Sequence, residues 1–311
     1  MATIGKVDSL WRYPVKSMAG EALDEAFLGF AGVYGDRLFA FTSSAGPKGF
    51  PFLTAREQHE MLRYRPRFRS ADKAARPPNL AEAEKLAPGV TPLYARPAEI
   101  MVDVETPSGE VLAIDDPRLA RLLGEGMPEV PAPAVQLLRS DRSMTDCRPV
   151  SIFSVQTVQQ LSQELGGAAL DPRRFRANIY VDLPSAGGLG LGSGLGFGEQ
   201  ALVGRSLRLG PKAVVSVLER DPRCKMITLD PDTGRSDPQI LRQVAQAHDA
   251  TAGVYSAVLV EGTCTKATRS SCWIRRVVRQ RSVDGSLRAG PCRPGPARHG
   301  PALFRTPPHH D

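Results

Sequence analysis

The frequency of glycine and proline most constrains what this chain can fold into. Its 311 residues include 29 glycines and 27 prolines. Both residue types disfavour helix interiors, and proline also interrupts the hydrogen bonding of a central strand. Residues 100–104 and 110–114, on either side of the turn Pro107-Ser108-Gly109, predict a hairpin. Many short strands with few helices are typical of barrels, so we expect a mainly β chain with some α (an α+β fold).

Apolar spacing and turn residues give a coarse map of the elements. Helices are predicted over 116–123, 155–165 and 240–247. Strands are predicted over 3–13, 23–28, 37–42, 135–138, 177–181, 201–204, 207–210, 214–218 and 254–260. Three prolines within 128–133 predict a linker. We therefore expect two β-barrel-like domains, over 1–127 and 135–262.

The positive charge is concentrated at the C-terminal end. The net charge is +7, but the 49 residues after Gly262 hold ten of the 40 basic residues and two of the 33 acidic ones. This tail therefore carries +8, and residues 1–262 carry −1. The basicity gives no reason to expect the body to bind nucleic acid. The arginine-rich and proline-rich stretch 263–311 is predicted to be disordered.

The five cysteines match no common metal or cluster pattern. They are Cys147, Cys224, Cys264, Cys272 and Cys292. There is no C-x-x-C, and the spacings fit neither a zinc site nor an iron–sulfur cluster. The N-terminus has no signal-peptide pattern, and no apolar run reaches the length of a membrane span. An odd cysteine count then predicts reduced thiols and a cytoplasmic protein.

Cys224 has the most suggestive surroundings of the five. It lies between Arg223 and Lys225, and the turn sequence Asp-Pro-Asp-Thr-Gly begins at Asp230. Nearby positive charge stabilises a thiolate, which can act as a nucleophile or as a soft metal ligand. The alternative is a half-buried structural cysteine before a hairpin. Asp230 is likewise either a site residue or a turn-former.

Several separated motifs occur in an order that resembles one family. They are Tyr13-Pro14-Val15-Lys16-Ser17, Gly35-Asp36-Arg37-Leu38, Leu53-Thr54-Ala55-Arg56, the run from Asp171 to Ile179, Phe197-Gly198-Glu199, and Arg223-Cys224 followed by the turn at 230–234. This order resembles the MOSC-domain family with its N-terminal β-barrel domain, including the amidoxime-reducing enzymes. The resemblance covers about residues 3–262. It implies that the second domain is a MOSC barrel of the pyruvate-kinase type.

The resemblance implies a cofactor and a set of residues around it. The family binds molybdenum cofactor, a pterin dithiolene with a terminal phosphate, and one protein cysteine completes the metal's thiolate ligands. Cys224 falls on that position, with Asp230 as a second candidate catalytic residue. The residues that would bind the cofactor are Lys16, Ser17, Arg37, Ser154, Arg176, Asn178, Arg223 and Tyr255. Guanidinium and ammonium groups suit a phosphate, and a carboxamide suits a pterin edge.

The resemblance also implies an activity. The cofactor carries the redox chemistry, and a small N-hydroxylated substrate (an amidoxime or hydroxylamine), or an N- or S-oxide, loses oxygen. At family level it further implies pyridoxal phosphate binding. The chain shows no ferredoxin, flavin or haem signature, so we expect a separate electron-donor protein of the ferredoxin, cytochrome or flavoprotein type. No nucleic acid or membrane-span partner is expected. The alternatives are a non-catalytic cofactor or sulfur carrier and a binder of RNA or membrane surfaces through the tail.

The chain departs from the family after Gly262. Family members close with a strand containing Gly-Asp, whereas this chain becomes rich in arginine and cysteine. One inserted base after the codon for Thr263 permits Thr-Val-His-Glu-Gly-Asp-Ala-Val-Glu-Leu-Leu. We therefore hypothesise that 263–311 is out of frame, with a natural basic extension as the alternative. If the sequence is as written, the second barrel is expected to lack its last strand and leave an open edge.

Overall fold

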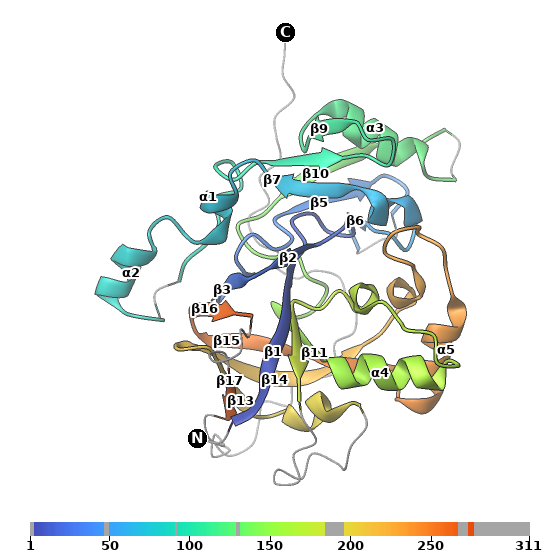
Figure 1. Cartoon of the computed structure of the whole chain (residues 1–311). Helices are drawn as coiled ribbons and strands as arrows, with labels where there is room; N and C mark the ends of the chain where they lie inside the picture. Colours follow the sequence, from blue (N-terminus) through green and yellow to red (C-terminus); the bar gives the residue numbers. More distant parts are fainter. Residues whose placement is uncertain are drawn as a thin grey trace.

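Short strands dominate the architecture. The computed structural model describes residues 3–46, 50–90, 92–128, 131–183 and 196–266, together with the backbone of 273–276. Strands outweigh helices by 34% to 24%, which confirms the predicted mainly β fold with some α. Figure 1 shows small sheets at the top, a barrel beneath them, and helices α4 (Val155–Glu164) and α5 (Pro238–Ala247) beside the barrel.

The barrel is closed by pairing between its first and last strands. Its neighbours run in the order β12 (Ile179–Asp182), β11 (Val150–Ser154), β15 (Thr251–Val260), β14 (Ala213–Pro222), β13 (Ser206–Leu209), β17 (Trp273–Arg276) and β1 (Thr3–Arg12), and β1 pairs again with β12. β2 (Glu21–Leu23) extends the sheet from β1. β11 and β12 are parallel and the other pairs are antiparallel. Such closure leaves few free backbone groups at sheet edges.

Three small sheets form the upper part. They are β10 (Val135–Arg139) with β5 (Phe39–Ser43) and β6 (Phe52–Leu53); β16 (Gly262–Thr265) with β3 (Glu25–Gly29) and β4 (Gly32–Val33); and β7 (Arg65–Phe68) with β8 (Val102–Glu105) and β9 (Val111–Ala113). The last two strands form the predicted hairpin, which is confirmed. The sheets of β5 and β7 share one apolar core, and Leu229 of the segment after Cys224 is buried in it. The sheet of β3 contributes Leu28 and Cys264 to the core of the barrel.

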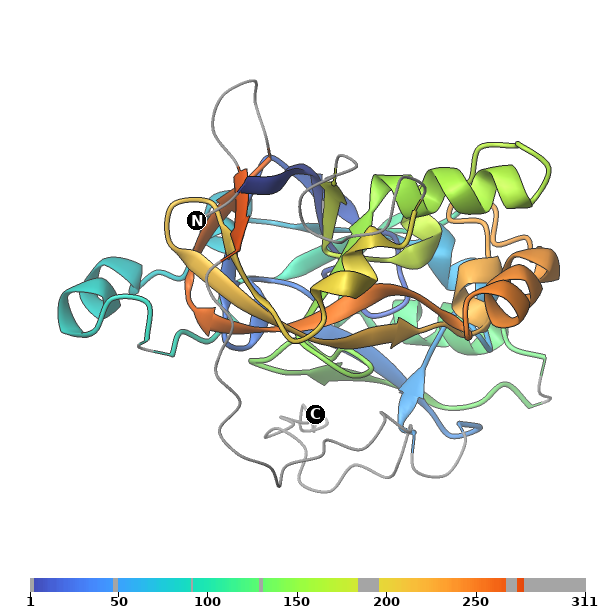
Figure 2. The ribbon, with the colours of Figure 1, turned by 90° about the horizontal axis from the view of Figure 1, so that it is seen from below.

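Capping residues fix the helix starts. Asp116, Ser154 and Asp237 cap α3 (Pro117–Glu125), α4 and α5 with their side chains. The three predicted helices are therefore confirmed. Shorter helical segments are η1 (His59–Arg63), α1 (Ala71–Ala75), α2 (Leu80–Leu86), η2 (Pro172–Phe175), η3 (Gly198–Leu202) and η4 (Lys225–Thr228). Seen from below, α2 and the pair α4 and α5 lie on opposite sides of the barrel (Figure 2).

One predicted strand is wrong. Residues 201 and 202 end η3, a 3-10 helix, and residues 203 and 204 form the turn after it. Glu199 and Leu202 are buried while Val203 is exposed, so the inward-facing residues are three apart as in one helical turn. The apolar run at 201–204 is too short for its sequence pattern to distinguish a strand from a helical turn.

The strands do not divide at the predicted domain boundary. β1 belongs to the barrel formed mainly by the second half of the chain, with Val7 opposite Val181. β10, assigned to the second domain, pairs with β5 of the first. The two halves are therefore interleaved by long-range strand pairing, which local composition does not reveal.

The predicted disorder after Gly262 is wrong where the structure describes the chain. β16 pairs with β3, and Cys264 is fully buried because the side chains of this strand alternate inward and outward. The backbone of β17 lies between β1 and β13 in the barrel. The expected open edge is therefore filled. Residues 267–272 and 277–311 lie outside the described part.

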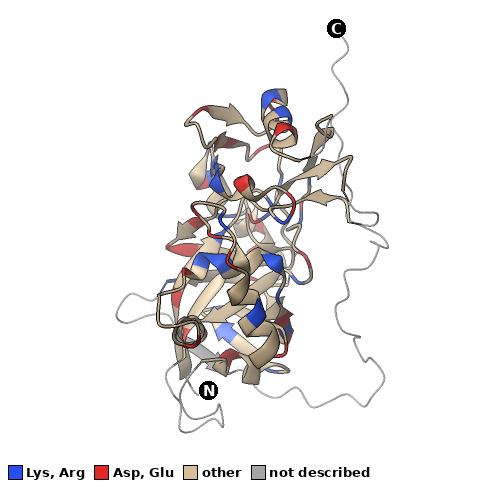
Figure 3. Cartoon of the chain, turned by 90° about the vertical axis from the view of Figure 1, so that its right-hand side faces the viewer, with Lys and Arg blue, Asp and Glu red and all other residues tan. Residues whose placement is uncertain are grey.

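Charges of both signs are spread over the described residues. Lysine and arginine are interspersed with aspartate and glutamate along the ribbon (Figure 3). None of the described helices has the length and apolar content that crossing a membrane requires.

Candidate functional site

A strongly cationic cavity lies where the upper sheets meet the barrel. It encloses about 760 Å³ of space free of protein atoms, part of it open to solvent. Its charged lining residues are Lys16, Arg37, Arg56, Arg148, Arg174, Arg176 and Arg223, with Asp146 and Asp221 as the carboxylates. Cations exceed carboxylates by five, so the cavity favours an anion.

The structure brings most of the predicted site residues to this one cavity. The lining includes eight of the ten: Lys16, Ser17, Arg37, Arg176, Asn178, Arg223, Cys224 and Tyr255. Tyr255 lies on β15, and the other seven lie in loops: after β1, between β4 and β5, between η2 and β12, and after β14. Ser154 and Asp230 are not among the lining residues.

The backbone is held in unusual conformations at three of these positions. Ser17, Arg37 and Arg176 have positive φ angles of 66°, 48° and 52°. The part of the chain that the structure describes contains six such non-glycine residues, so half of them line the cavity. Left-handed backbone costs energy for residues with a Cβ, and such positions cluster at functional sites.

Arg37 and Arg176 flank the buried Tyr13. Their guanidinium carbons lie 4.6 and 4.2 Å from the centre of the Tyr13 ring. Arg37 donates to Asp36 at 2.5 Å and to the Arg176 carbonyl at 3.1 Å. Burial raises the pKa of Tyr13 to about 12 even though both cations oppose it. The phenol therefore stays neutral while its ring supports both guanidinium groups.

Arg176 keeps one donor without a protein partner. Its Nη1 donates to the Met18 carbonyl at 2.8 Å. Its Nη2 is buried and has no hydrogen-bond partner among the described residues. Burial lowers the pKa of Arg176 to about 10. Because a buried unsatisfied donor costs free energy, this nitrogen is suited to an anionic ligand.

Lys16 is buried at one end of the cavity. Its Nζ donates to the Met144 carbonyl at 2.8 Å and to Asp146 Oδ1 at 2.5 Å. Burial lowers the pKa of Lys16, and the Asp146 carboxylate opposes that effect. The Asp146 side chain is 55% exposed, so it can exchange its partner for solvent when an anion approaches Lys16.

Arg223 is fixed by the backbone next to Cys224. Its Nε donates to the Ala252 carbonyl at 2.6 Å and its Nη1 to the Phe175 carbonyl at 3.0 Å. Its Nη2 lies 2.8 Å from Asp221 Oδ2, but it has no well-aligned hydrogen bond. The two groups form an ion pair, since opposite charges attract without strict alignment.

Asp221 is a buried carboxyl in the cavity wall. It accepts a hydrogen bond from Ser151 Oγ at 3.1 Å, and Tyr255 also donates to it. Burial raises the pKa of Asp221 to about 6, although Arg223 opposes the shift. This carboxyl can therefore hold a proton near pH 6.

Cys224 lies directly after β14 and begins η4. Its side chain is partly exposed and is not in a disulfide. The neighbouring Lys225 Nζ donates to the Arg56 carbonyl at 2.9 Å, which links η4 to the upper sheets. The thiol is therefore held at the cavity by elements from both halves of the chain.

Asn178 uses its carboxamide to join strands. Its Oδ1 accepts from the Ser151 backbone N–H and its Nδ2 donates to the Trp11 carbonyl, both at 3.3 Å. It is almost fully buried. The predicted pterin contact would compete with these bonds, so a role in shaping the cavity wall fits the structure better.

Ser154 lies outside the cavity lining, at the start of α4. It is fully buried and caps α4, accepting a hydrogen bond from the Thr157 backbone N–H at 3.1 Å. Its Oγ also lies 2.8 Å from Thr157 Oγ1. These contacts are those of a helix cap, a role that is strongly favoured for serine at such a position.

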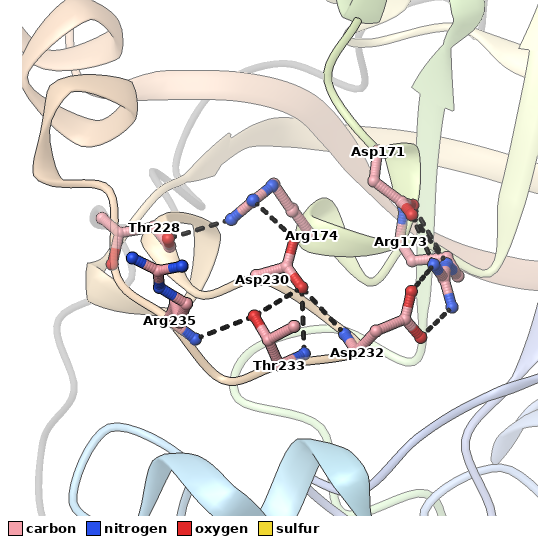
Figure 4. Close-up of polar contacts among 8 residues, drawn as sticks. All are labelled: Asp171, Arg173, Arg174, Thr228, Asp230, Asp232, Thr233 and Arg235. Atoms are coloured by element: carbon pink, nitrogen blue, oxygen red, sulfur yellow. Dashed lines mark hydrogen bonds and ion pairs between the residues drawn. The ribbon is translucent and has the colours of Figure 1, made fainter.

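Asp230 supports the cavity from behind. It accepts hydrogen bonds from the backbone N–H groups of Asp232 and Thr233 at 3.2 and 2.9 Å, which close the turn. It also lies 2.9 Å from Arg174 Nη2, and Arg174 lines the cavity (Figure 4). Asp230 is thus a turn-former and a positioning residue for Arg174.

Five charged lining residues were missed from the sequence, among them Asp221, which lies only three residues before Cys224. Arg56 and Arg174 lie within motifs that carried the family resemblance, so their positions could have been included. Asp146 and Arg148 come from the loop between β10 and β11, which has no recognisable pattern. Only the folded chain shows that this loop reaches Lys16.

Comparisons with known proteins agree with the sequence motifs. A family model described as the MOSC domain matches residues 139–275, and one described as the MOSC N-terminal beta barrel domain matches residues 4–84. No curated protein matches the chain.

Solved structures show distant similarity. The YuaD protein from Bacillus subtilis has 12% identity and a TM-score of 0.40, over 87% of this chain and 93% of that one. YiiM from Geobacillus stearothermophilus has 16% identity and a TM-score of 0.31, over 43% of this chain and 56% of that one. The two family matches, with the cavity residues that carry the motifs, identify the chain as a member of the MOSC-domain family with an N-terminal β-barrel domain.

Proposed function

We propose that this chain binds molybdenum cofactor in the cationic cavity and acts as an oxidoreductase on small N-hydroxylated substrates or related N- and S-oxides. MOSC domains are associated in general with binding of this cofactor. The observation that carries the proposal is the combination, in one cavity, of the Cys224 thiol and the unpartnered, buried Nη2 of Arg176.

The residues present suit such a group. Arg176, Arg37 and Lys16 offer charged donors for a phosphate, and the three left-handed positions hold the backbone at this end. Cys224 offers one thiolate for a metal. In the described ranges no cluster of three His, Cys, Asp or Glu side chains could bind a metal unaided. A metal that arrives within a cofactor therefore fits better than a bare ion.

The bound cofactor would supply the two-electron redox chemistry. The protein's part is to bind, orient and provide protons. Removing oxygen from an N-hydroxylated substrate as water consumes two protons, and Asp221 can hold one at its carboxyl group near pH 6. Tyr255 donates to that carboxyl, so it fixes the direction in which the carboxyl oxygens point.

The proposal includes a separate electron donor of the ferredoxin, cytochrome or flavoprotein type, and a cytoplasmic location. The expectation of reduced thiols is wrong for Cys147, which is disulfide-bonded. The proposal leaves out pyridoxal phosphate. A Schiff base needs an unencumbered amine, and the buried Lys16 amine is bound to Asp146 and to the Met144 carbonyl.

A non-catalytic cofactor or sulfur carrier is the second candidate. The exposure of the Cys224 thiol would suit sulfur transfer as well as metal ligation. Turnover that depends on an N-hydroxylated substrate separates the two, because a carrier would bind cofactor without consuming reductant.

Replacing Cys224 with alanine tests the proposal. We expect Cys224→Ala to lower the rate of benzamidoxime reduction about a thousandfold or more, because the metal loses its protein ligand. Reduced methyl viologen serves as the electron source. Pterin content is expected to persist, since the cations remain. Arg121→Ala, at an exposed position of α3, is the control and should retain most activity. Wild-type turnover in Cys224→Ala would contradict the assignment.

A further inference from the structure

A second, larger groove lies behind the wall of the cavity. It encloses about 1130 Å³ of space and runs between β1, β2, the strand β7 and the turn at 230–234. The wall is η2 with the residue that follows it. Arg174 lines the cavity, Arg173 lines the groove, and Arg176 lines both. Figure 4 shows Arg173 and Arg174 diverging from adjacent positions toward Asp232 and Asp230.

The groove has an excess of positive charge. Its cations are Arg63, Arg65, Arg67, Arg173 and Arg176, and its carboxylates are Glu21 and Asp232. Both carboxylates are already engaged, Glu21 by Arg12 at 2.8 Å and Asp232 by Arg173 at 2.9 and 2.6 Å. The lining therefore retains positive charge that no carboxylate within the groove offsets.

Two exposed arginines of the groove lie on β7, the edge strand of its sheet. Arg65 and Arg67 are exposed and alternate with the buried Pro66 and Phe68, so both point to the same face. Arg65 lies 3.6 Å from Glu105. Arg67 has no ion pair with any described residue. Side chains two apart on a strand are separated by about 7 Å. Arg63 continues this row of exposed guanidinium groups, although it is paired with Glu60 at 2.5 Å.

We infer that this groove is the docking surface for the acidic face of the protein that delivers electrons. The inference rests on the proposed function. The exposed arginines are spread along a strand edge rather than converging on one point, which fits a row of carboxylates on a protein better than a single small anion. Through Arg176 the groove shares a wall with the cavity, so a protein docked there is separated from the cofactor position only by η2 and Arg176.

Charge complementarity of this kind acts mainly on association and on its dependence on salt. The chain thus needs a partner with an acidic surface and a one-electron carrier near it. The groove supplies orientation, and the redox groups of the two proteins supply the transfer.

The experiment uses the full, molybdenum-loaded chain and a reduced plant-type ferredoxin as an acidic one-electron probe. Binding is measured by calorimetry at low and high salt. The test variant is Arg65→Glu with Arg67→Glu, and the matched control is Arg118→Glu with Arg121→Glu on α3. Arg67→Gln is a milder test variant that removes only a guanidinium without an ion pair. Turnover with reduced methyl viologen and molybdenum content are measured in parallel.

We expect the double reversal on β7 to weaken ferredoxin binding about tenfold or more at low salt, and the control to change it by less than about twofold. Viologen-driven turnover and molybdenum content should stay at wild-type levels in both. The inference is overturned if the wild-type protein does not bind ferredoxin, or if the test and control variants weaken ferredoxin binding equally. Pyrophosphate binding is measured on the same proteins. The inference is also overturned if the β7 variants lose pyrophosphate binding while no protein binds ferredoxin, because the groove would then be a small-anion site. If wild-type protein binds ferredoxin but shows no viologen-driven turnover, the proposed activity fails and the docking surface stands.

Discussion

At the scale of single residues, Arg176 and Arg223 hold the cavity in a state suited to an anion. Both are fixed through backbone carbonyls, so their guanidinium groups are oriented before any ligand binds. Such preorganisation avoids the entropy cost of ordering long side chains on binding. The cost is a buried donor on Arg176 that the described protein leaves unsatisfied.

Neutralising either arginine should lower cofactor occupancy. A hydrogen bond to an ionised group contributes about 1.5–3 kcal/mol, so we expect Arg176→Gln and Arg223→Gln each to weaken binding by about 10-fold to 150-fold. Molybdenum per chain after dialysis is the measurement, with the exposed Arg121→Gln as control. Full occupancy in both cavity variants would place the cofactor elsewhere.

Asp221 should make stability depend on pH. Its pKa is raised from 3.8 to about 6, so between these values the folded chain keeps a proton that the unfolded chain has lost. Its stabilising contribution is therefore present at about pH 4 and is lost as pH rises through about 6, a difference on the order of 3 kcal/mol. Urea unfolding of cofactor-free protein across this range should show a shallower pH dependence for Asp221→Asn. Equal slopes for the two proteins would show that Asp221 titrates normally.

At the scale of elements, short segments place the charges. The turn at 230–234 binds two consecutive arginines of η2, Arg174 through Asp230 and Arg173 through Asp232 (Figure 4). The hydrogen bonds from Arg173 lower the pKa of Asp232. One turn therefore orients both the cavity side and the groove side of the same wall.

The helix cap and the cavity serine should respond differently to mutation. Ser154→Ala is expected to cost about 1 kcal/mol of stability, because α4 loses its cap, and to leave cofactor content unchanged. Ser17→Gly removes a cavity hydroxyl at a positive φ that glycine accepts without strain. It should lower cofactor affinity with little loss of stability. If Ser154→Ala lost cofactor while keeping full stability, Ser154 would be a cofactor-binding residue.

At the scale of the whole molecule, β17 completes the barrel. Its backbone pairs with β1 on one side and β13 on the other, at three positions each. Without it both neighbours would have free edges, which promote aggregation. The reason for expecting an incomplete barrel from the written sequence therefore no longer holds, and the out-of-frame hypothesis now depends on the gene alone.

Two truncations test this closure. A chain ending at residue 266 lacks β17 and should lose about 3 kcal/mol or more, from its strand hydrogen bonds, and aggregate. A chain ending at residue 276 keeps the strand and should remain monodisperse by light scattering. Equal behaviour of the two would show that β17 does not close the barrel. Resequencing the gene in independent clones decides the reading frame.

The sequence by itself determined the family, the mainly β fold, the hairpin, three helices and eight of the residues that line the cavity. These follow from local signals: turn residues, caps, alternation, and motifs whose side chains point to one place when the chain folds. The tertiary structure alone decided that β1 belongs to the barrel, that β16 and β17 are strands, and that the loop carrying Asp146 meets Lys16. These features depend on pairing between residues far apart in the chain, and the free energy that selects such pairings comes from long-range burial and hydrogen bonding that no local pattern encodes.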